Sequence, residues 1–512
     1  MRKFNLVDEK WIPVRFLDGS RDELGISETL LRSSEIAVIE DPSPLVVAAL
    51  HRFLLAVLYR ALEGPTDIEQ AKALFKAGLP GGRIKAYLEK WSGNGRFWLF
   101  DDKYPFGQVP SVPEIEAEPW TKLTAEHNAT TSKVLFDHTD TKSLKPISLA
   151  AAAKWVVATL NFSVRGGRGY RPSPSADGII CIPIGKDLQQ TLLCSLVPYP
   201  NRTMIVSDLP IWEREPSSYS EFKSGQERIA AGFADLYTWQ ARAMRLLQTS
   251  DGQVDRVAFI PGFGHVESEL RDPMVPYMAR RDTGIEQVGF EERGVWASFD
   301  SLLPDAGSIE GLEPKVINYL GILSRSRLVG AALPLTVIGQ KFTNASVEFW
   351  RMERFTLPIN ISENRYLKSE IHELLSLAND AGDSLEWSLR ELAKSMITKG
   401  DRELLPDKWV AGKLKSGDVT KFVKSTGVLP QYWTLLESHF QTVLSSYALS
   451  HSSESIRCDW LKSVHNALHT AWSHYSSSLS TGDAWAMRAV VKASKPTRVK
   501  LAELKEEIEK YS

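Results

Sequence analysis

The strongest constraint on the fold is a change of pattern after "FTLPIN" at residues 355–360. Beyond it, apolar side chains recur every three or four residues over about 150 positions, as the run Leu385, Leu389 and Leu392 illustrates. Glycines interrupt this pattern and predict breaks between helices at Gly382, Gly400, Gly427 and Gly482. We therefore expect four or five antiparallel helices packed as a bundle.

The preceding part of the chain, up to about residue 357, has a different pattern of apolar and turn-forming residues. Short apolar runs closed by glycine or proline predict strands at 11–16 ("WIPVRF") and 178–185 ("GIICIPIG"). The apolar stretch 44–62 predicts a long buried helix, and 221–247 predicts a second helical region. The fold class is therefore predicted as α+β, a mixed domain followed by helices.

Composition excludes several classes of protein. A length of 512 residues is enough for about two to four domains, and a net charge of -2 excludes a strongly basic nucleic-acid coat protein. Three widely spaced cysteines without a CxxC pair argue against a disulfide framework and a cysteine zinc site. With no apolar signal-peptide core, we expect a soluble, cytoplasmic protein that does not enter a membrane.

One short loop is unusually rich in glycine and arginine. "SVRGGRGYR" at 163–171 places Gly166, Gly167 and Gly169 among arginines, including Arg165 and Arg168. Glycine allows a backbone to approach a ligand closely. The simpler alternative is a tight surface turn whose arginines are solvated.

Two further stretches are candidates for nucleic-acid contacts. In "GQKFTNASVEFWRME" (339–353), small polar residues at a loop tip can insert beside base pairs, or they can form an Asx turn. The segment 127–146 is rich in Thr, Ser and Lys around the apolar pair Leu135 and Phe136. It is either a solvated loop or a segment that becomes ordered on a partner such as RNA.

Signatures of catalysis are missing from the sequence. His465 and His469 have the spacing of a zincin, but Asn466 replaces the catalytic glutamate and a third ligand is not evident. Phosphate-binding loops, the GxSxG elbow and kinase motifs are absent. We therefore predict no cofactor, no metal site and no enzymatic activity.

The order of five motifs resembles one known family. The motifs are "NLVDEKWIPV" (5–14), "TSKVLFDH" (131–138), "TLNFSVRGGRG" (159–169), "LYTWQARAMRL" (236–246) and "TNAS" (343–346), followed by the helical tail. Together they resemble the CasA large subunits of the type I-E CRISPR surveillance complex, Cascade. The resemblance covers essentially the whole chain.

That resemblance implies a mixed N-terminal domain, 1–357, and a C-terminal four-helix bundle, 358–512. It also implies a non-catalytic subunit that reads the protospacer-adjacent motif in duplex DNA and opens the duplex to start R-loop formation. The implied partners are double-stranded target DNA, the 5′ handle of the guide RNA, the other Cascade subunits and a helicase-nuclease. The alternatives from other classes are a hydrolase or transferase with a helical oligomerisation domain, and a purely structural subunit.

The resemblance also assigns roles to individual residues. The family's glycine loop, which faces the minor groove, corresponds to Gly166, Gly167, Arg168 and Gly169, with Arg165 beside it. Its wedge corresponds to Thr343, Asn344 and Ala345, with Asn344 in the place of a glutamine. Its lysine finger aligns with Arg256, and its guide-RNA segment aligns with Lys133, Val134, Leu135 and Phe136.

Overall fold

The computed structural model describes most of the chain: residues 3–127, 144–167, 169–223, 225–280, 284–291, 293–303, 312–343, 346–359, 366–397, 416–449, 451–479 and 484–511. It divides into two compact units. The first unit comprises Met1–Phe290 and Ile309–Phe355, and the second comprises Glu291–Ser308 and Thr356–Ser512.

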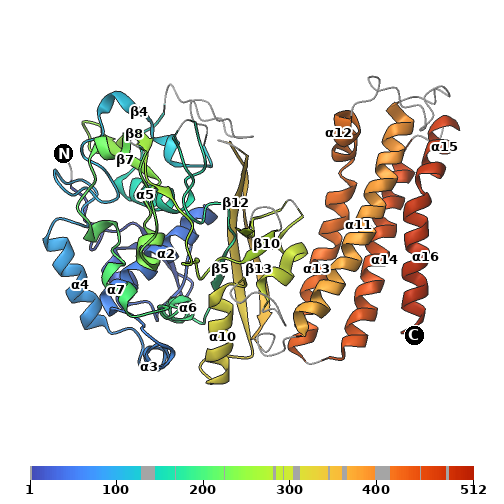
Figure 1. Cartoon of the computed structure of the whole chain (residues 1–512), viewed down its shortest axis with the longest axis horizontal. Helices are drawn as coiled ribbons and strands as arrows, with labels where there is room; N and C mark the ends of the chain where they lie inside the picture. Colours follow the sequence, from blue (N-terminus) through green and yellow to red (C-terminus); the bar gives the residue numbers. More distant parts are fainter. Residues whose placement is uncertain are drawn as a thin grey trace. The chain divides into compact units, whose positions relative to one another are not determined.

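The first unit is built around the helix α2 (Pro44–Leu62), as the apolar run predicts (Figure 1). Ser43 caps the helix by accepting the Val46 N–H, and Pro44 occupies the first turn, where its missing N–H costs nothing. Every residue of α2 except Pro44 and Arg60 is buried. By length and composition alone α2 could cross a bilayer, but 94% of its apolar window is buried inside the protein.

Shorter helices surround α2. Its main helical neighbours are α4 (Gly81–Gly93), α5 (Leu149–Phe162) and α9 (Phe233–Tyr237). The remaining helices of this unit are α1 (Ile26–Leu31), α3 (Ile68–Ala77), α6 (Leu188–Ser195), α7 (Thr203–Ser207), α8 (Tyr219–Lys223), α10 (Lys315–Arg325) and the 3₁₀ turns η1 (Glu114–Glu116), η2 (Trp120–Leu123) and η3 (Ile211–Glu213).

Small sheets complete the first unit. The three-stranded sheets have the orders β2-β1-β3, β4-β8-β7 and β13-β12-β5. Their strands are β1 (Ile12–Phe16), β2 (Arg21–Leu24), β3 (Ile36–Ile39), β4 (Ala117–Pro119), β5 (Ile180–Pro183), β7 (Arg242–Gln248), β8 (Val254–Pro261), β12 (Ala332–Thr343) and β13 (Ser346–Pro358). Two pairs are separate: antiparallel β10 (Tyr277–Arg280) with β11 (Gly284–Gln287), and parallel β6 (Glu227–Arg228) with β9 (Gly264–His265). Strands β1 and β5 agree with the sequence prediction.

The prediction of a helical region over 221–247 is wrong. The helix α8 ends at Lys223, and the chain then forms β6, the single helical turn α9 and the strand β7. Gly232, which precedes α9, lies so close to Asp208 that a Cβ there would come within 2.2 Å of its Cγ. Strand β7 pairs along its length with β8, the next strand of the chain, and the hydrogen bonds between them outweigh the local helical spacing.

The second unit is helical, as the repeating apolar spacing predicts. Its four longest helices are α11 (Leu367–Ile397), α13 (Val428–Ala448), α14 (Ser453–Ser478) and α16 (Lys495–Glu509), which pack along one another (Figure 1). Two shorter helices, α12 (Ser416–Thr426) and α15 (Ala484–Ala493), accompany them. The 3₁₀ segment η4 (Val295–Leu302) belongs to this unit too, with its Trp296 ring in contact with Trp433, Phe440 and Trp460.

The predicted glycine breaks have different outcomes. Gly427 is confirmed as a break because it caps α13 with a φ of 67°. Gly382 is not a break, since it lies inside α11. A Cβ at Gly382 would come within 2.6 Å of the Trp433 ring, so this glycine allows close helix packing instead. Gly400 and Gly482 lie outside the described residues.

Candidate nucleic-acid interface

The glycine-rich loop is a closed excursion from the end of α5. Ser163 follows the last residue of the helix, and the Ser173 N–H returns to the Ser163 carbonyl at 2.8 Å. Within the loop, the Tyr170 N–H donates to the Gly167 carbonyl at 3.1 Å. The loop is therefore a short structure held by its own backbone, and Arg168 is its one residue outside the described set.

The three glycines of this loop differ in whether the fold requires glycine at their positions. Gly169 has a φ of 86°, a backbone conformation that residues other than glycine rarely adopt. A Cβ on Gly166 would come within 2.9 Å of the Tyr170 Cβ. Gly167 has neither constraint: its φ is not in the left-handed region, and a Cβ would meet nothing within 4 Å. The fold of this unit therefore leaves Gly167 free to be another residue.

Tyr170 anchors the loop to the sheet below. Its ring stacks on Phe259 of β8, with centroids 6.3 Å apart and an interplanar angle of 14°. Its hydroxyl donates to the Phe259 carbonyl at 3.0 Å, and burial raises the pKa of this phenol. The loop consequently rests on β8, while Gly167 and Gly169 are exposed to solvent.

The end of β12 is tied to the same place. The buried Gln340 donates from its amide to the Phe162 carbonyl at 2.9 Å, at the point where α5 ends and the loop begins. Partial desolvation raises the pKa of the Asp177 carboxyl, although the residue is exposed, and the charges of Lys341 and Arg165 oppose that rise. Arg165 and Lys341 are both exposed. Arg165 of the loop and Lys341 of β12 therefore both act on the charge of Asp177.

The predicted wedge lies only partly within the described residues. Thr343 is exposed at the end of β12, and its hydroxyl donates to Glu348 of β13 at 2.6 Å. Asn344 and Ala345 lie outside the described residues. Because β12 begins this connection beside the glycine loop, two stretches about 175 residues apart in sequence reach one region of the surface.

Arg256 lies apart from the glycine loop and the wedge, the other two segments that the sequence predicts to contact DNA. It lies on β8, exposed, with its Cα opposite Leu247 of β7 and Pro119 of β4. Phe259, which supports the glycine loop, is three residues further along the strand. Successive side chains alternate between the two faces of a strand, so Arg256 and Phe259 point to opposite faces. The structure thus does not bring the Arg256 side chain onto the face that carries the glycine loop.

The predicted guide-RNA residues Lys133, Val134, Leu135 and Phe136 lie outside the described residues, but the flanks of their segment are described. Trp120 contacts both flanks: its ring packs edge-on against His127, and its indole N–H donates to the Lys145 carbonyl at 3.0 Å. Ile147 pairs with Val254 at the start of β8. The segment therefore leaves and returns at one point, beside the β4–β8 pair that carries Arg256.

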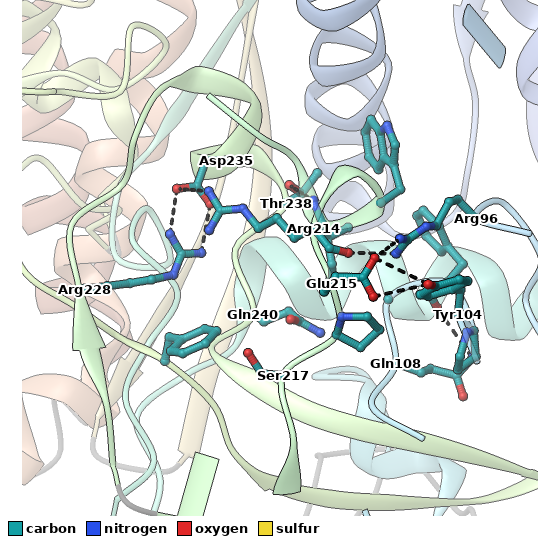
Figure 2. A pocket seen from close by; sticks show the side chains of 17 residues that line it. Arg96, Tyr104, Gln108, Arg214, Glu215, Ser217, Arg228, Asp235, Thr238 and Gln240 are labelled. Atoms are coloured by element: carbon teal, nitrogen blue, oxygen red, sulfur yellow. Dashed lines mark hydrogen bonds and ion pairs between the residues drawn. The ribbon is translucent and has the colours of Figure 1, made fainter. Parts of the chain in front are cut away.

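A cavity of about 110 Å³ elsewhere in the first unit could suggest an active site (Figure 2). Its charged groups are engaged with one another. Asp235 accepts both terminal nitrogens of Arg228 at 2.6 and 2.8 Å and one of Arg214 at 2.9 Å. At the rim, Glu215 pairs with Arg96 at 2.6 Å. Because these charged side chains are bound to one another, none of them is free to act on a substrate, and the cavity does not favour acid–base catalysis.

The histidine pair does not form a metal centre with its described neighbours. His465 is partly buried and His469 exposed on α14, and their nearest hydrogen-bonding partners are Asn466 and Ser473, at 3.4 and 3.5 Å. Within the described ranges, no three His, Cys, Asp or Glu side chains come together as ligands for a metal ion.

Sequence reasoning missed two residues that the structure places at the interface. Lys341 precedes the wedge, and only the tertiary structure brings its charge near Asp177. Arg242, in the motif "LYTWQARAMRL", lies beneath the glycine loop. Local pattern carries no signal for such contacts, because both depend on segments distant in the sequence.

Comparison with known proteins identifies relatives over the whole chain. The family model described as CRISPR-associated protein Cse1 matches residues 5–471. The CRISPR-associated protein CasA/Cse1 of Thermus thermophilus is 33% identical over 520 aligned positions, covering 99% of each chain. The structure of Thermus thermophilus CasA (Cse1) matches with a TM-score of 0.80 at 30% identity, covering 98% of this chain and 100% of that one. A chain of a CRISPR RNA-guided surveillance complex shares the fold, with a TM-score of 0.72 at 18% identity, over 97% of this chain and 100% of that one.

Proposed function

The chain belongs to the CRISPR-associated Cse1 family, and from that premise we propose that it is the DNA-recognition subunit of a type I-E CRISPR surveillance complex. In this role it reads a short motif in duplex DNA, while the guide RNA reads the remaining target by base pairing. The observation that carries the proposal is the shared location of the glycine loop and the end of β12, joined by the hydrogen bond from Gln340 to the Phe162 carbonyl. Each of the two segments carries an exposed cation, Arg165 on the loop and Lys341 on β12.

The glycine loop would enter the minor groove at the motif. That groove is only about 6 Å wide, so a bare backbone fits where side chains would clash. Gly167 supports this role because the fold itself places no demand on it, whereas an approaching groove would. Arg165 and Lys341, both exposed, would bind the flanking phosphates and make the affinity depend on salt.

The connection between β12 and β13 would act as the wedge. Thr343, Asn344 and Ala345 would insert beside the motif and separate the first base pair, which costs a few kcal/mol of unstacking. The bond from Thr343 to Glu348 would keep the base of the wedge rigid as it enters. R-loop formation would then proceed from that point.

The guide RNA would be bound at a second place. Lys133, Val134, Leu135 and Phe136 would contact its 5′ handle and help to dock the subunit on the rest of the complex. The nearby Arg256 remains a predicted nucleic-acid contact, and its location beside the flanks of this segment favours an additional contact at that edge. The other Cascade subunits and the helicase-nuclease are the remaining proposed partners.

We also propose that the chain is non-catalytic and cytoplasmic. The paired charges in the cavity around Asp235 support the first point against a hydrolase or transferase. The cysteines, which are free and buried, are compatible with a reducing compartment: Cys181, Cys194 and Cys458.

A mobility-shift assay on the assembled complex, with its guide RNA, tests the proposal. Duplexes with and without the motif are compared at several salt concentrations, and the complex lacking this chain is the control. Motif-dependent binding that disappears with the chain supports DNA recognition. Equal binding to both duplexes would favour a purely structural subunit, and target hydrolysis by the chain alone would favour the enzymatic alternative.

A further inference from the structure

A single arginine joins the two ends of the glycine loop. Arg242, the first residue of β7, donates from one terminal nitrogen to the Val164 carbonyl and from the other to the Arg171 carbonyl. A further hydrogen bond, 2.8 Å long, reaches the Ala241 carbonyl. Since Val164 and Arg171 stand on either side of the glycines, the guanidinium spans the base of the loop.

This guanidinium is buried and is not neutralised by a carboxylate. Arg242 is only 4% exposed, and none of the described acidic residues forms an ion pair with it. Its charge lies 4.9 Å from the centroid of the Tyr170 ring and 5.8 Å from that of Phe259, so two aromatic rings and three carbonyls replace its hydration. Burial lowers its pKa to about 10, which leaves it charged at neutral pH.

The other buried arginines described in this unit are neutralised. Arg52 pairs with Asp272, and Arg96 pairs with Glu215. An unpaired buried charge is costly, and an apolar side chain would fill the same space at lower cost. Arg242 is therefore an exception among the buried arginines, and its hydrogen bonds to the glycine loop account for an arginine at this position.

We propose that Arg242 is the positioning residue of the glycine loop, holding both of its ends and placing a positive charge beneath the backbone that would enter the minor groove. The part of this inference that concerns DNA binding rests on the proposed function. The clamp, meaning the hydrogen bonds from Arg242 to the Val164 and Arg171 carbonyls, is a property of the free chain. The planar fork of arginine reaches two carbonyls at once, whereas the ammonium of lysine is a single point of donation. Arg242→Lys should therefore keep the charge and lose the clamp, and Arg242→Met should lose both.

The clamp is tested first in the full-length free chain by hydrogen exchange. The amides of Tyr170 and Ser173, both hydrogen-bonded within the loop, should exchange at least tenfold faster in Arg242→Lys and Arg242→Met. Arg60→Lys, which alters a partly buried ion pair away from the loop, should leave these amides unchanged. Should Arg242→Met fail to fold, Arg242→Lys still decides the matter. Unchanged exchange in Arg242→Lys would overturn the clamp.

The DNA part is tested in the assembled complex with motif-bearing duplex. Arg242→Lys should weaken binding several-fold and Arg242→Met more strongly, while Arg60→Lys should bind as the wild type does. Faster loop exchange with wild-type affinity in both Arg242 variants would overturn the positioning role. A wild-type complex without motif preference would instead overturn the proposed function, and the exchange data would then decide the clamp by themselves.

Discussion

Gly167→Asp provides the sharpest test of the glycine loop, because the fold tolerates the change and the proposed DNA contact does not. A Cβ at this position meets nothing within 4 Å, and the backbone is not left-handed. We therefore expect the free energy of unfolding to change by no more than about 0.5 kcal/mol, as for surface substitutions generally. Any large loss of DNA binding must then arise in the complex.

The size of that loss follows from electrostatics. A carboxylate about 8 Å from one phosphate is repelled by about 2 kcal/mol at an effective dielectric constant near 20, and screening by salt reduces this to about 1 kcal/mol. These energies correspond to roughly five- to thirtyfold weaker duplex binding, before any steric exclusion from the groove is added. The weakening should apply to every motif-bearing target, since the loop docks before strand separation.

The assay compares thermal melts of the free chain with duplex affinities of the assembled complex. Gly167→Asn isolates the steric effect because it has nearly the same size without the charge. Gly82→Asp adds the same charge at another glycine whose Cβ would meet nothing within 4 Å, in α4. Wild-type affinity in Gly167→Asp would refute the reasoning and make this loop a simple surface turn.

Three further predictions concern other parts of the molecule. Asn344→Ala should leave motif binding largely intact but slow R-loop formation, and negatively supercoiled plasmid should partly rescue it; an equal defect on relaxed and supercoiled targets would contradict the wedge. Burial lowers the pKa of His51 to about 4, so the unfolded state binds more protons below pH 6.5. Urea titrations should therefore show the free energy of unfolding falling by about 3 kcal/mol between pH 6.5 and 4, with a smaller fall in His51→Gln. Gly382→Ala should destabilise the second unit by about 1–3 kcal/mol, because its Cβ would overlap the Trp433 ring; an unchanged melting profile would show that the helices adjust freely.

Features that depend on local spacing could be predicted from the sequence. The apolar run of α2 determines both its helical conformation and its burial, since a helix that is apolar on all sides has no face for solvent. The repeating leucines beyond residue 358 likewise predict helices without reference to the rest of the chain. In the glycine loop, the residue types predict a close-approach backbone, although not what supports it.

Other features were decided by contacts between distant segments. Gly382 lies inside α11 rather than between helices, and the Trp433 ring of α13 occupies the space that a side chain at Gly382 would fill. Residues 295–302 belong to the helical unit, where Trp296 packs against Phe440. No local sequence pattern predicts this packing.

The candidate interface shows the same division. Its glycines and its small polar residues are visible in the sequence as two separate loops. Only the tertiary structure places the end of β12 beside the glycine loop through Gln340, and Arg242 beneath that loop. The physical reason is that a hydrogen bond or an aromatic contact is specified by two partners, and the sequence around either partner describes only one of them.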